Sequence, residues 1–158
     1  MYIEELKPGV TRRSASPDWP KPYVGVGGAM HGNEPCGAEA ISRIALAFEE
    51  GTLAPAKGTI FLVHANPLAT AQGRRHTPEG DDLNRLWDFE FTETLRKEAW
   101  GYEHHRVLEL KEVLGGLDVF LDLHSAGTST PAFGVSNGEA QIDEIAKQIG
   151  IAYLVQSW

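Results

Sequence analysis

The stretch YVGVGGAMHGNEPCGAEAISRIALAFEEG, residues 23–51, decides the fold. Its opening, YVGVGGA (23–29), is a short β-rich run that ends in glycines, which predicts a strand. Pro35 suits the first position of a helix, and Gly51 suits the residue after its end. Between them, apolar side chains recur at helical spacing, at Ile41, Ile44, Ala45 and Phe48. The stretch therefore predicts a strand, a polar loop and a helix over residues 35–50.

Further strands and helices follow in alternation. The nearly continuous apolar runs GTIFLVHA (58–65) and LDVFLDL (117–123) predict strands that are covered on both faces. A helix is expected over 92–114, with one apolar side formed by Leu95, Ala99, Tyr102, Leu110 and Val113. The last elements are predicted as a strand at 132–136, a helix at 139–149 and a strand at 152–156. This order predicts an α/β fold with a mostly parallel or mixed sheet flanked by helices.

The bulk composition narrows the class of protein. The 158 residues are interpreted as one domain, in which residues 1–21, with three prolines and little periodicity, form a mostly irregular lead-in. A net charge of -8 argues against nucleic acid as a partner. No apolar run approaches the roughly 18 residues of a membrane span, and the first residues lack a signal-peptide core. With Cys36 as its one cysteine, the chain is expected to be cytoplasmic.

Two histidines follow predicted strands. His31 comes just after the strand at 23–29, and His124 just after the strand at 117–123. In α/β sheets, ligands collect at the carboxyl ends of the strands. Glu34 lies three residues after His31, so both side chains can reach one face of a turn. Because catalytic zinc takes three protein ligands, these residues predict one zinc ion per chain, with Asp122 as a hydrogen-bond partner of a ligand.

Plainer interpretations stay open for each residue. Glu34 also suits a helix start through the helix dipole, and His124 alone could be a packed core histidine. His64, at the end of a strand, is the main rival ligand, and His76 could reach a substrate. Cys36 is expected to face the helix interior, because thiolate ligands are typical of closed structural sites. The two remaining histidines are assigned solvated or packing roles: His104 and His105.

Arginines gather in the aperiodic stretch that begins with NPLATAQGRRHTPEGDDLNRLW (66–87), at Arg74, Arg75 and Arg85. The guanidinium fork suits a planar carboxylate, and it can also stabilise the oxyanion of an attacked amide. The alternative is a set of surface arginines paired with nearby acids, worth roughly 0–1 kcal/mol each. That alternative is preferred for Arg74, whereas for Asn84 with Arg85 both interpretations remain open.

Four separated motifs agree in order and approximate spacing: GGAMHGNEPCG (27–37), NP (66–67), DLNR (82–85) and DLHS (122–125). Together they resemble the succinylglutamate desuccinylase/aspartoacylase family, zinc-dependent deacylases related to the zinc carboxypeptidases. The resemblance implies a zinc carboxypeptidase-like (phosphorylase/hydrolase-like) fold and hydrolysis of an N-acyl amino acid, a small carboxylated substrate, by metal-activated water.

The resemblance also implies roles for particular residues. It matches the zinc ligands to His31, Glu34 and His124, and the contacts to the substrate carboxylate to Asn84 and Arg85. It matches Arg75, nine residues after Asn66, to the arginine that polarises the scissile carbonyl. Arg74 stays open for that role, because the following loop is slightly longer than in the aspartoacylases.

One part of the family pattern has no match. In the family, a glutamate on a strand well after the third zinc ligand is the general base, and a β-rich C-terminal region follows. Here the glutamates after His124 are Glu139 and Glu144, which suit a solvated helix, so the general base is not identified and the fold is expected to be incomplete at its C-terminal end. A zinc carboxypeptidase-type peptidase and a catalytically incomplete metal-binding fragment remain as alternatives. An unfinished sheet edge near Trp158 suggests a homo-oligomer.

Overall fold

The computed structural model describes residues 1–87, 100–126 and 129–156. The chain divides into two compact units, Met1–Ser125 and Ala126–Trp158. The interpretation of residues 1–158 as one domain stays a prediction. Among the described residues, no helix has the length and apolar character needed to span a membrane.

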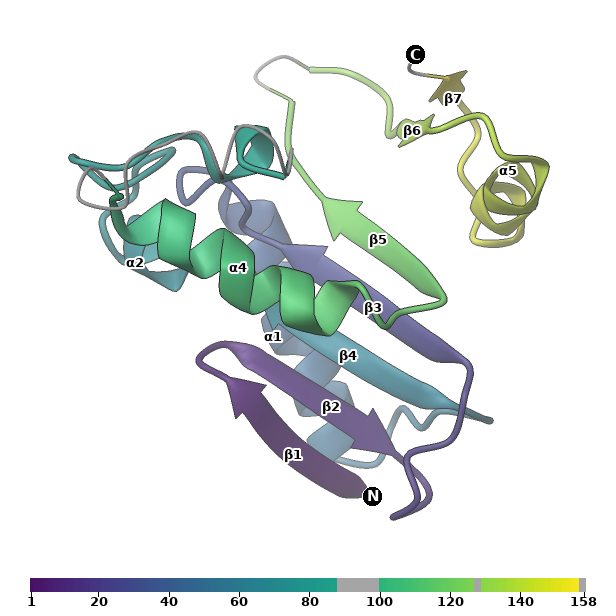
Figure 1. The fold of residues 1–158 in the computed structure, drawn as a ribbon. Helices are drawn as coiled ribbons and strands as arrows, with labels where there is room; N and C mark the ends of the chain where they lie inside the picture. Colours follow the sequence, from purple (N-terminus) through teal and green to yellow (C-terminus); the bar gives the residue numbers. More distant parts are fainter. Residues whose placement is uncertain (88–99, 127–128, 157–158) are drawn as a thin grey trace. The chain divides into compact units, whose positions relative to one another are not determined.

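The first unit is built on a five-stranded mixed sheet in the order β1-β2-β4-β3-β5. Its strands β3 (Tyr23–Gly28), β4 (Thr59–His64) and β5 (Val119–Leu123) are parallel. The hairpin formed by β1 (Tyr2–Lys7) and β2 (Val10–Ser14) adds to β4 in the antiparallel sense. Helices α1 (Pro35–Glu49) and α4 (Tyr102–Leu114) lie on opposite faces of this sheet (Figure 1). The predicted α/β fold with a mixed sheet is confirmed.

Strand β4 shows why the central strands are apolar throughout. Val63 is fully buried in a cluster that includes Val107 and Leu110 of α4. Its neighbour Leu62 belongs to a separate cluster with residues of α1 such as Phe48. Because successive side chains of a strand point to opposite faces, burial under two helices requires an unbroken apolar run.

The expectation of an irregular lead-in over residues 1–21 was wrong, because residues 2–7 and 10–14 form the hairpin β1–β2. The turn was visible in the sequence, since Pro8 is followed by Gly9, which takes φ +73 as a type II turn requires. Most side chains of β1 are exposed, so this strand has little apolar periodicity. Pairing of β2 with β4, rather than local propensity, determines the structure of this segment.

The stretch after β4 contains two short elements that the sequence did not predict. Helix α2 (Pro67–Ala71) begins after Asn66, whose side chain accepts a hydrogen bond from the backbone N–H of Ala69. A 3-10 turn, η1 (Leu83–Arg85), is capped by Asp82 in the same way, through Asn84 N–H. The predicted helix at 92–114 is present from Tyr102 onward, and residues 92–99, with Leu95 and Ala99, lie outside the described residues.

Two glycines bring α1 close to the sheet at the carboxyl ends of the strands. A Cβ added to Gly37 would lie 2.7 Å from the carbonyl oxygen of Leu123 and 2.9 Å from the Cα of Gly28. Gly28 ends β3 and Leu123 ends β5, so this approach places the start of α1 at the ends of two neighbouring strands. The loop that carries His31 and Glu34 lies at the same place.

The second unit contains β6 (Gly134–Ser136), α5 (Ala140–Gln148) and β7 (Leu154–Gln156), with β6 and β7 paired in parallel. These elements agree with the strand, helix and strand predicted for this region. The hydroxyl of Ser136 donates a 2.6 Å hydrogen bond to Asp143 of α5, which ties the helix to its strand.

Candidate metal centre

The three residues predicted as ligands lie together at the carboxyl ends of β3 and β5. His31 follows β3 in a turn that is closed by the hydrogen bond from Glu34 N–H to His31 C=O, at 3.0 Å. Gly32 has no room for a side chain, because a Cβ there would lie 2.1 Å from the backbone of Ala69. His124 follows β5, the strand that pairs with β3. The ligand atoms of His31, Glu34 and His124 all lie within 4.8 Å of one another.

Glu34 lies between the two imidazole rings. Its Oε1 is 2.7 Å from Nδ1 of His31, and its Oε2 is 3.1 Å from Nδ1 of His124. The backbone N–H of Ser125 donates a further hydrogen bond of 2.8 Å to Oε2. Both histidines therefore present the same ring nitrogen, Nδ1, to one carboxylate.

The other nitrogen of each ring is held by an aspartate. Nε2 of His31 lies 3.0 Å from Oδ1 of Asp82, and Nε2 of His124 lies 2.7 Å from Oδ2 of Asp122. In a neutral ring whose Nε2–H donates to the aspartate, the lone pair lies on Nδ1 and is free to bind a cation. The contact between Asp122 and His124 agrees with the strand pattern, and its role behind a metal ligand stays a prediction. Asp82 was missed as a histidine partner, although it is the first residue of the DLNR motif.

This hydrogen-bond pattern provides a test of whether the site suits a cation. If each neutral ring donates Nε2–H to its aspartate, both Nδ1 lone pairs face the oxygens of Glu34, which are acceptors only. Lone pairs facing at 2.7 and 3.1 Å repel one another. A divalent cation at this point converts the repulsion into ligation, and two imidazoles with one carboxylate are a common donor set for zinc. The residues present fit a zinc ion.

The surroundings set the acidity of the carboxylates and of His124. Burial acts to raise the pKa of Glu34, but the Ser125 N–H and the two histidines outweigh it, so the pKa is lowered. Burial likewise opposes ionisation of Asp82, yet hydrogen bonds from Arg75 and from the backbone of Asn84 lower its pKa. The hydrogen bond to Asp122 raises the pKa of His124. Glu34, the carboxylate of the ligand group, and Asp82, which lies behind His31, thus favour their ionised forms.

Arg75 is connected to the cluster through Asp82. Its Nε and one terminal nitrogen donate to Oδ2 of Asp82 at 2.9 and 2.7 Å, while Oδ1 of the same carboxylate faces His31. Asn84 is half-buried, and Arg85 is exposed, with one hydrogen bond of 3.2 Å to the carbonyl of Asn84. Among the described residues, neither Arg74 nor Arg85 has a carboxylate partner. Asp88 lies outside the described residues, so both interpretations of Arg74 and Arg85 stay predictions.

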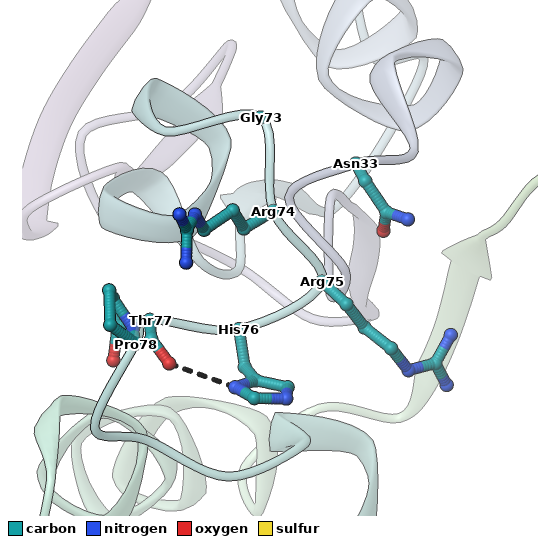
Figure 2. Close-up of a pocket in the computed structure, with 7 residues that line it drawn as sticks. All are labelled: Asn33, Gly73, Arg74, Arg75, His76, Thr77 and Pro78. Carbon is teal, nitrogen blue, oxygen red and sulfur yellow. Dashed lines mark hydrogen bonds between the residues drawn. The ribbon is translucent and has the colours of Figure 1, made fainter.

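The loop that carries the arginines borders a hollow of about 320 Å³. Figure 2 shows Arg74 and Arg75 leaving the loop in different directions, with Asn33 beside Arg75 on the neighbouring loop. The ring of His76 is held here by a 2.8 Å hydrogen bond from Nδ1 to the carbonyl of Thr77. The volume is at the lower end of the range for small-molecule sites.

The remaining predicted residues lie outside the cluster. His64, the rival ligand, instead contacts the hydroxyl of Thr70 at 2.9 Å, and burial lowers its pKa. His104 is buried and His105 is exposed, both on α4. The expectation that Cys36 faces the helix interior was wrong, because this second residue of α1 is exposed. Both later glutamates lie in the second unit: Glu139 and Glu144.

The aspartate behind His124 gives a direct test of this geometry. We expect Asp122→Asn to raise the dissociation constant for zinc about 10- to 100-fold, because an amide can donate to Nε2 and move the ring proton to Nδ1. A competition titration against a chromophoric chelator measures the change. Asp18→Asn, at an exposed position far from the cluster in sequence, is the matched control. Equal zinc affinity in the two variants contradicts the assigned role of Asp122.

The fold and the site together define a class: an α/β domain with a His–Glu–His cluster at the carboxyl ends of its parallel strands. The sequence profile described as "Succinylglutamate desuccinylase/Aspartoacylase catalytic domain" matches residues 20–157. The chain belongs to this family. No individually curated protein matches the sequence.

Solved structures agree with this assignment. Succinylglutamate desuccinylase from Chromobacterium violaceum is 23% identical, with a TM-score of 0.70 over 96% of this chain and 52% of that one. An aspartoacylase family protein from Mesorhizobium loti is 29% identical, with a TM-score of 0.62; the match covers 89% of this chain and 42% of that one. A metallo-carboxypeptidase from Burkholderia cenocepacia is 18% identical, with a TM-score of 0.65 over 94% and 44%, and it shows the fold alone. The chain spans about half the length of these relatives.

Proposed function

We propose that the cluster is the metal centre of a zinc-dependent deacylase, which hydrolyses the amide bond of an N-acyl amino acid. His31, Glu34 and His124 hold the ion in this proposal. The observation that carries it is the arrangement of two Nδ1 atoms facing one carboxylate, with both Nε2 atoms occupied by aspartates. Membership of the family supports the reaction class.

Zinc bound at these residues supplies Lewis acidity, which polarises a carbonyl and lowers the pKa of water. Arg75 adds a cationic donor next to the same place. Because Asp82 contacts both Arg75 and His31, the guanidinium is fixed relative to the metal ligands before a substrate arrives. A donor held in advance stabilises the negative charge that develops on the amide oxygen without reorganising. This connection favours Arg75 over Arg74 for the role.

The substrate's free carboxylate is assigned to Asn84 and Arg85. Both follow Asp82 directly, on the 3-10 turn that Asp82 caps, so their position relative to the metal ligands is determined by the same aspartate. Arg85 is exposed and has no carboxylate partner among the described residues. Its guanidinium can therefore donate hydrogen bonds to the carboxylate of a ligand. Arginine and amide donors together suit the planar carboxylate of an amino acid.

A second candidate, a metal-binding unit without turnover of its own, is favoured by the carboxylates at the site. The described residues bring Glu34, Asp82 and Asp122 to the two histidines. Glu34 already accepts a hydrogen bond from Ser125 N–H, Asp82 accepts from Arg75, and Asp122 lies on Nε2 of His124. A general base must be free to take a proton from water. In this candidate the chain binds zinc and the acyl amino acid, and the base comes from residues outside the described set.

Two measurements on the zinc-loaded protein separate these candidates. A panel of N-acyl amino acids, including N-succinyl-L-glutamate, is tested for hydrolysis beside peptides with a free C-terminus. Release of the amino acid from the acyl compounds supports the deacylase, and release from the peptides supports a carboxypeptidase. Binding of the acyl compounds without hydrolysis supports the second candidate. A protein that binds neither zinc nor these compounds contradicts both.

The carboxylate contact predicts the behaviour of an Arg85 variant. We expect Arg85→Met to weaken binding of N-succinyl-L-glutamate to the zinc-loaded protein by about 10- to 100-fold, since a hydrogen bond to a charged group contributes roughly 1.5–3 kcal/mol. Isothermal titration calorimetry measures the affinity. Arg43→Met, which removes an exposed arginine of α1 paired with Glu39, is expected to bind like the unmodified chain. Equal affinity in both variants rules out this use of Arg85.

A further inference from the structure

Glu103 of α4 is a fully buried carboxylate, and within the described residues its side-chain hydrogen bonds all come from the segment 66–77. Its Oε1 accepts from the side-chain amide of Asn66 at 3.1 Å and from the backbone N–H of Thr77 at 2.7 Å. Its Oε2 accepts from the hydroxyl of Thr77 at 2.8 Å. The side chain is 0% exposed. One side chain on a helix therefore holds two points of the loop that are eleven residues apart in sequence.

A buried carboxylate such as Glu103 needs the hydrogen-bond donors that the loop supplies. Among the described residues Glu103 forms no ion pair, so neutral donors alone compensate for its burial. A buried carboxylate that loses a donor keeps the full cost of leaving water. Departure of the loop would remove donors from both oxygens at once. The loop conformation that satisfies Glu103 is therefore strongly favoured over any other.

The loop also packs closely against Glu103 at Gly80. A Cβ added to Gly80 would lie 1.7 Å from Oε2 of Glu103, so only glycine fits this approach. Gly80 is also joined to Thr77 by a backbone hydrogen bond of 3.1 Å. Asn66 at the start of the segment, and Thr77 and Gly80 near its end, thus lie against the same carboxylate.

The loop in turn contacts the turn that carries the metal ligands. The backbone N–H of Asn66 donates to the carbonyl of Ala29 at 3.1 Å, and Gly32 N–H donates to the carbonyl of Arg75 at 3.4 Å. Thr77, held by both oxygens of Glu103, is two residues from Arg75. Glu103 consequently determines where the backbone of Arg75 lies next to His31, although it touches neither.

We propose that Glu103 is a positioning residue for Arg75: it holds the loop so that the guanidinium stays on Asp82 beside the histidine cluster. Two features of the loop fit Glu103: the hydroxyl of Thr77, which donates a hydrogen bond to it, and the absence of a side chain at Gly80, which lets the backbone approach it. The consequence for turnover rests on the proposed function, whereas the position of the loop can be measured without it.

Limited proteolysis with trypsin tests the position of the loop, since the bonds after Arg74 and Arg75 are cleaved faster when the loop leaves its place and becomes locally unfolded. Thr77→Val removes the hydroxyl and keeps the shape, whereas Thr77→Ser keeps the hydroxyl. Glu103→Gln removes the charge, and Glu112→Gln, on an exposed face of the same helix, is its control. Cleavage after the exposed Lys57, followed by mass spectrometry, reports on general unfolding.

We expect Thr77→Val to raise the rate of cleavage after Arg74 and Arg75 at least about ten-fold relative to cleavage after Lys57. Glu103→Gln should change in the same direction, and Thr77→Ser and Glu112→Gln should stay within about two-fold of the unmodified chain. Unchanged cleavage in Thr77→Val overturns the proposal, as does an equal rise at Lys57, which reports a purely structural role. Zinc content, measured in parallel, separates this outcome from failure of the proposed function.

Discussion

Replacing either histidine of the cluster is expected to abolish stoichiometric zinc binding. In His31→Ala and His124→Ala a three-residue donor set loses one ligand and also leaves an aspartate without its imidazole partner. Loss of a partner behind a ligand costs about 10- to 100-fold in affinity, so loss of the ligand itself should cost at least about 100-fold. Chelator competition and metal analysis of the purified variants measure the effect.

His105→Ala is the matched control for these variants. His105 is exposed on α4 and lies outside the cluster, so the variant should bind zinc as the unmodified chain does. Circular dichroism of each variant shows whether the fold is retained. Full zinc occupancy in a folded His31→Ala or His124→Ala protein is incompatible with the proposed ligand set.

Arg106→Met is expected to produce the largest loss of stability. The Arg106 side chain is 1% exposed and donates to the carbonyls of Ala65 at 2.7 Å, Pro8 at 2.9 Å and His64 at 3.0 Å. Methionine fills much of the space but removes the donor from all three carbonyls and the ion-pair partner from Glu109, at about 1–3 kcal/mol for each acceptor that stays buried. We expect the free energy of unfolding to fall by about 3–6 kcal/mol, out of a typical 5–15 kcal/mol.

Urea denaturation of the two proteins measures this difference. Arg43→Met is the control, because the side chain of Arg43 is 78% exposed and its ion pair with Glu39 lies on the surface of α1. A surface substitution of this kind should change stability by less than about 0.5 kcal/mol. Similar losses in the two variants would show that the carbonyl contacts of Arg106 do not tie the β1–β2 turn to the end of β4.

Those parts of the fold that depend on apolar periodicity could be predicted from the sequence. Strands β3 and β4 and helix α1 follow the expected patterns, because each is covered by a neighbouring layer. Strand β5 forms where it was predicted, but the expectation that it is covered on both faces was wrong, because it ends the sheet order and Leu121 is 37% exposed. The proximity of His31 to His124 follows from the same patterns, since the carboxyl ends of parallel strands meet at one edge. Glu34 joins them because the turn after β3 is short.

Parts that depend on tertiary contacts of polar residues could not be predicted. Glu103 and Arg106 look like solvated helix charges in the sequence, yet both are buried by partners 26 or more residues away. Asp82 reaches His31 across 51 positions, in a stretch without periodicity. The sequence shows that an acid is present there, but nothing in its local pattern indicates which histidine it contacts.

The ligand set itself is most directly tested by the anomalous scattering of zinc in crystals of the protein grown with the metal. The proposal predicts one peak, within about 2.0–2.2 Å of Nδ1 of His31, Nδ1 of His124 and a carboxylate oxygen of Glu34. Asp82 and Asp122 should remain on the opposite ring nitrogens. A peak bound through Nε2, a peak at other residues, or no peak at this cluster would contradict it.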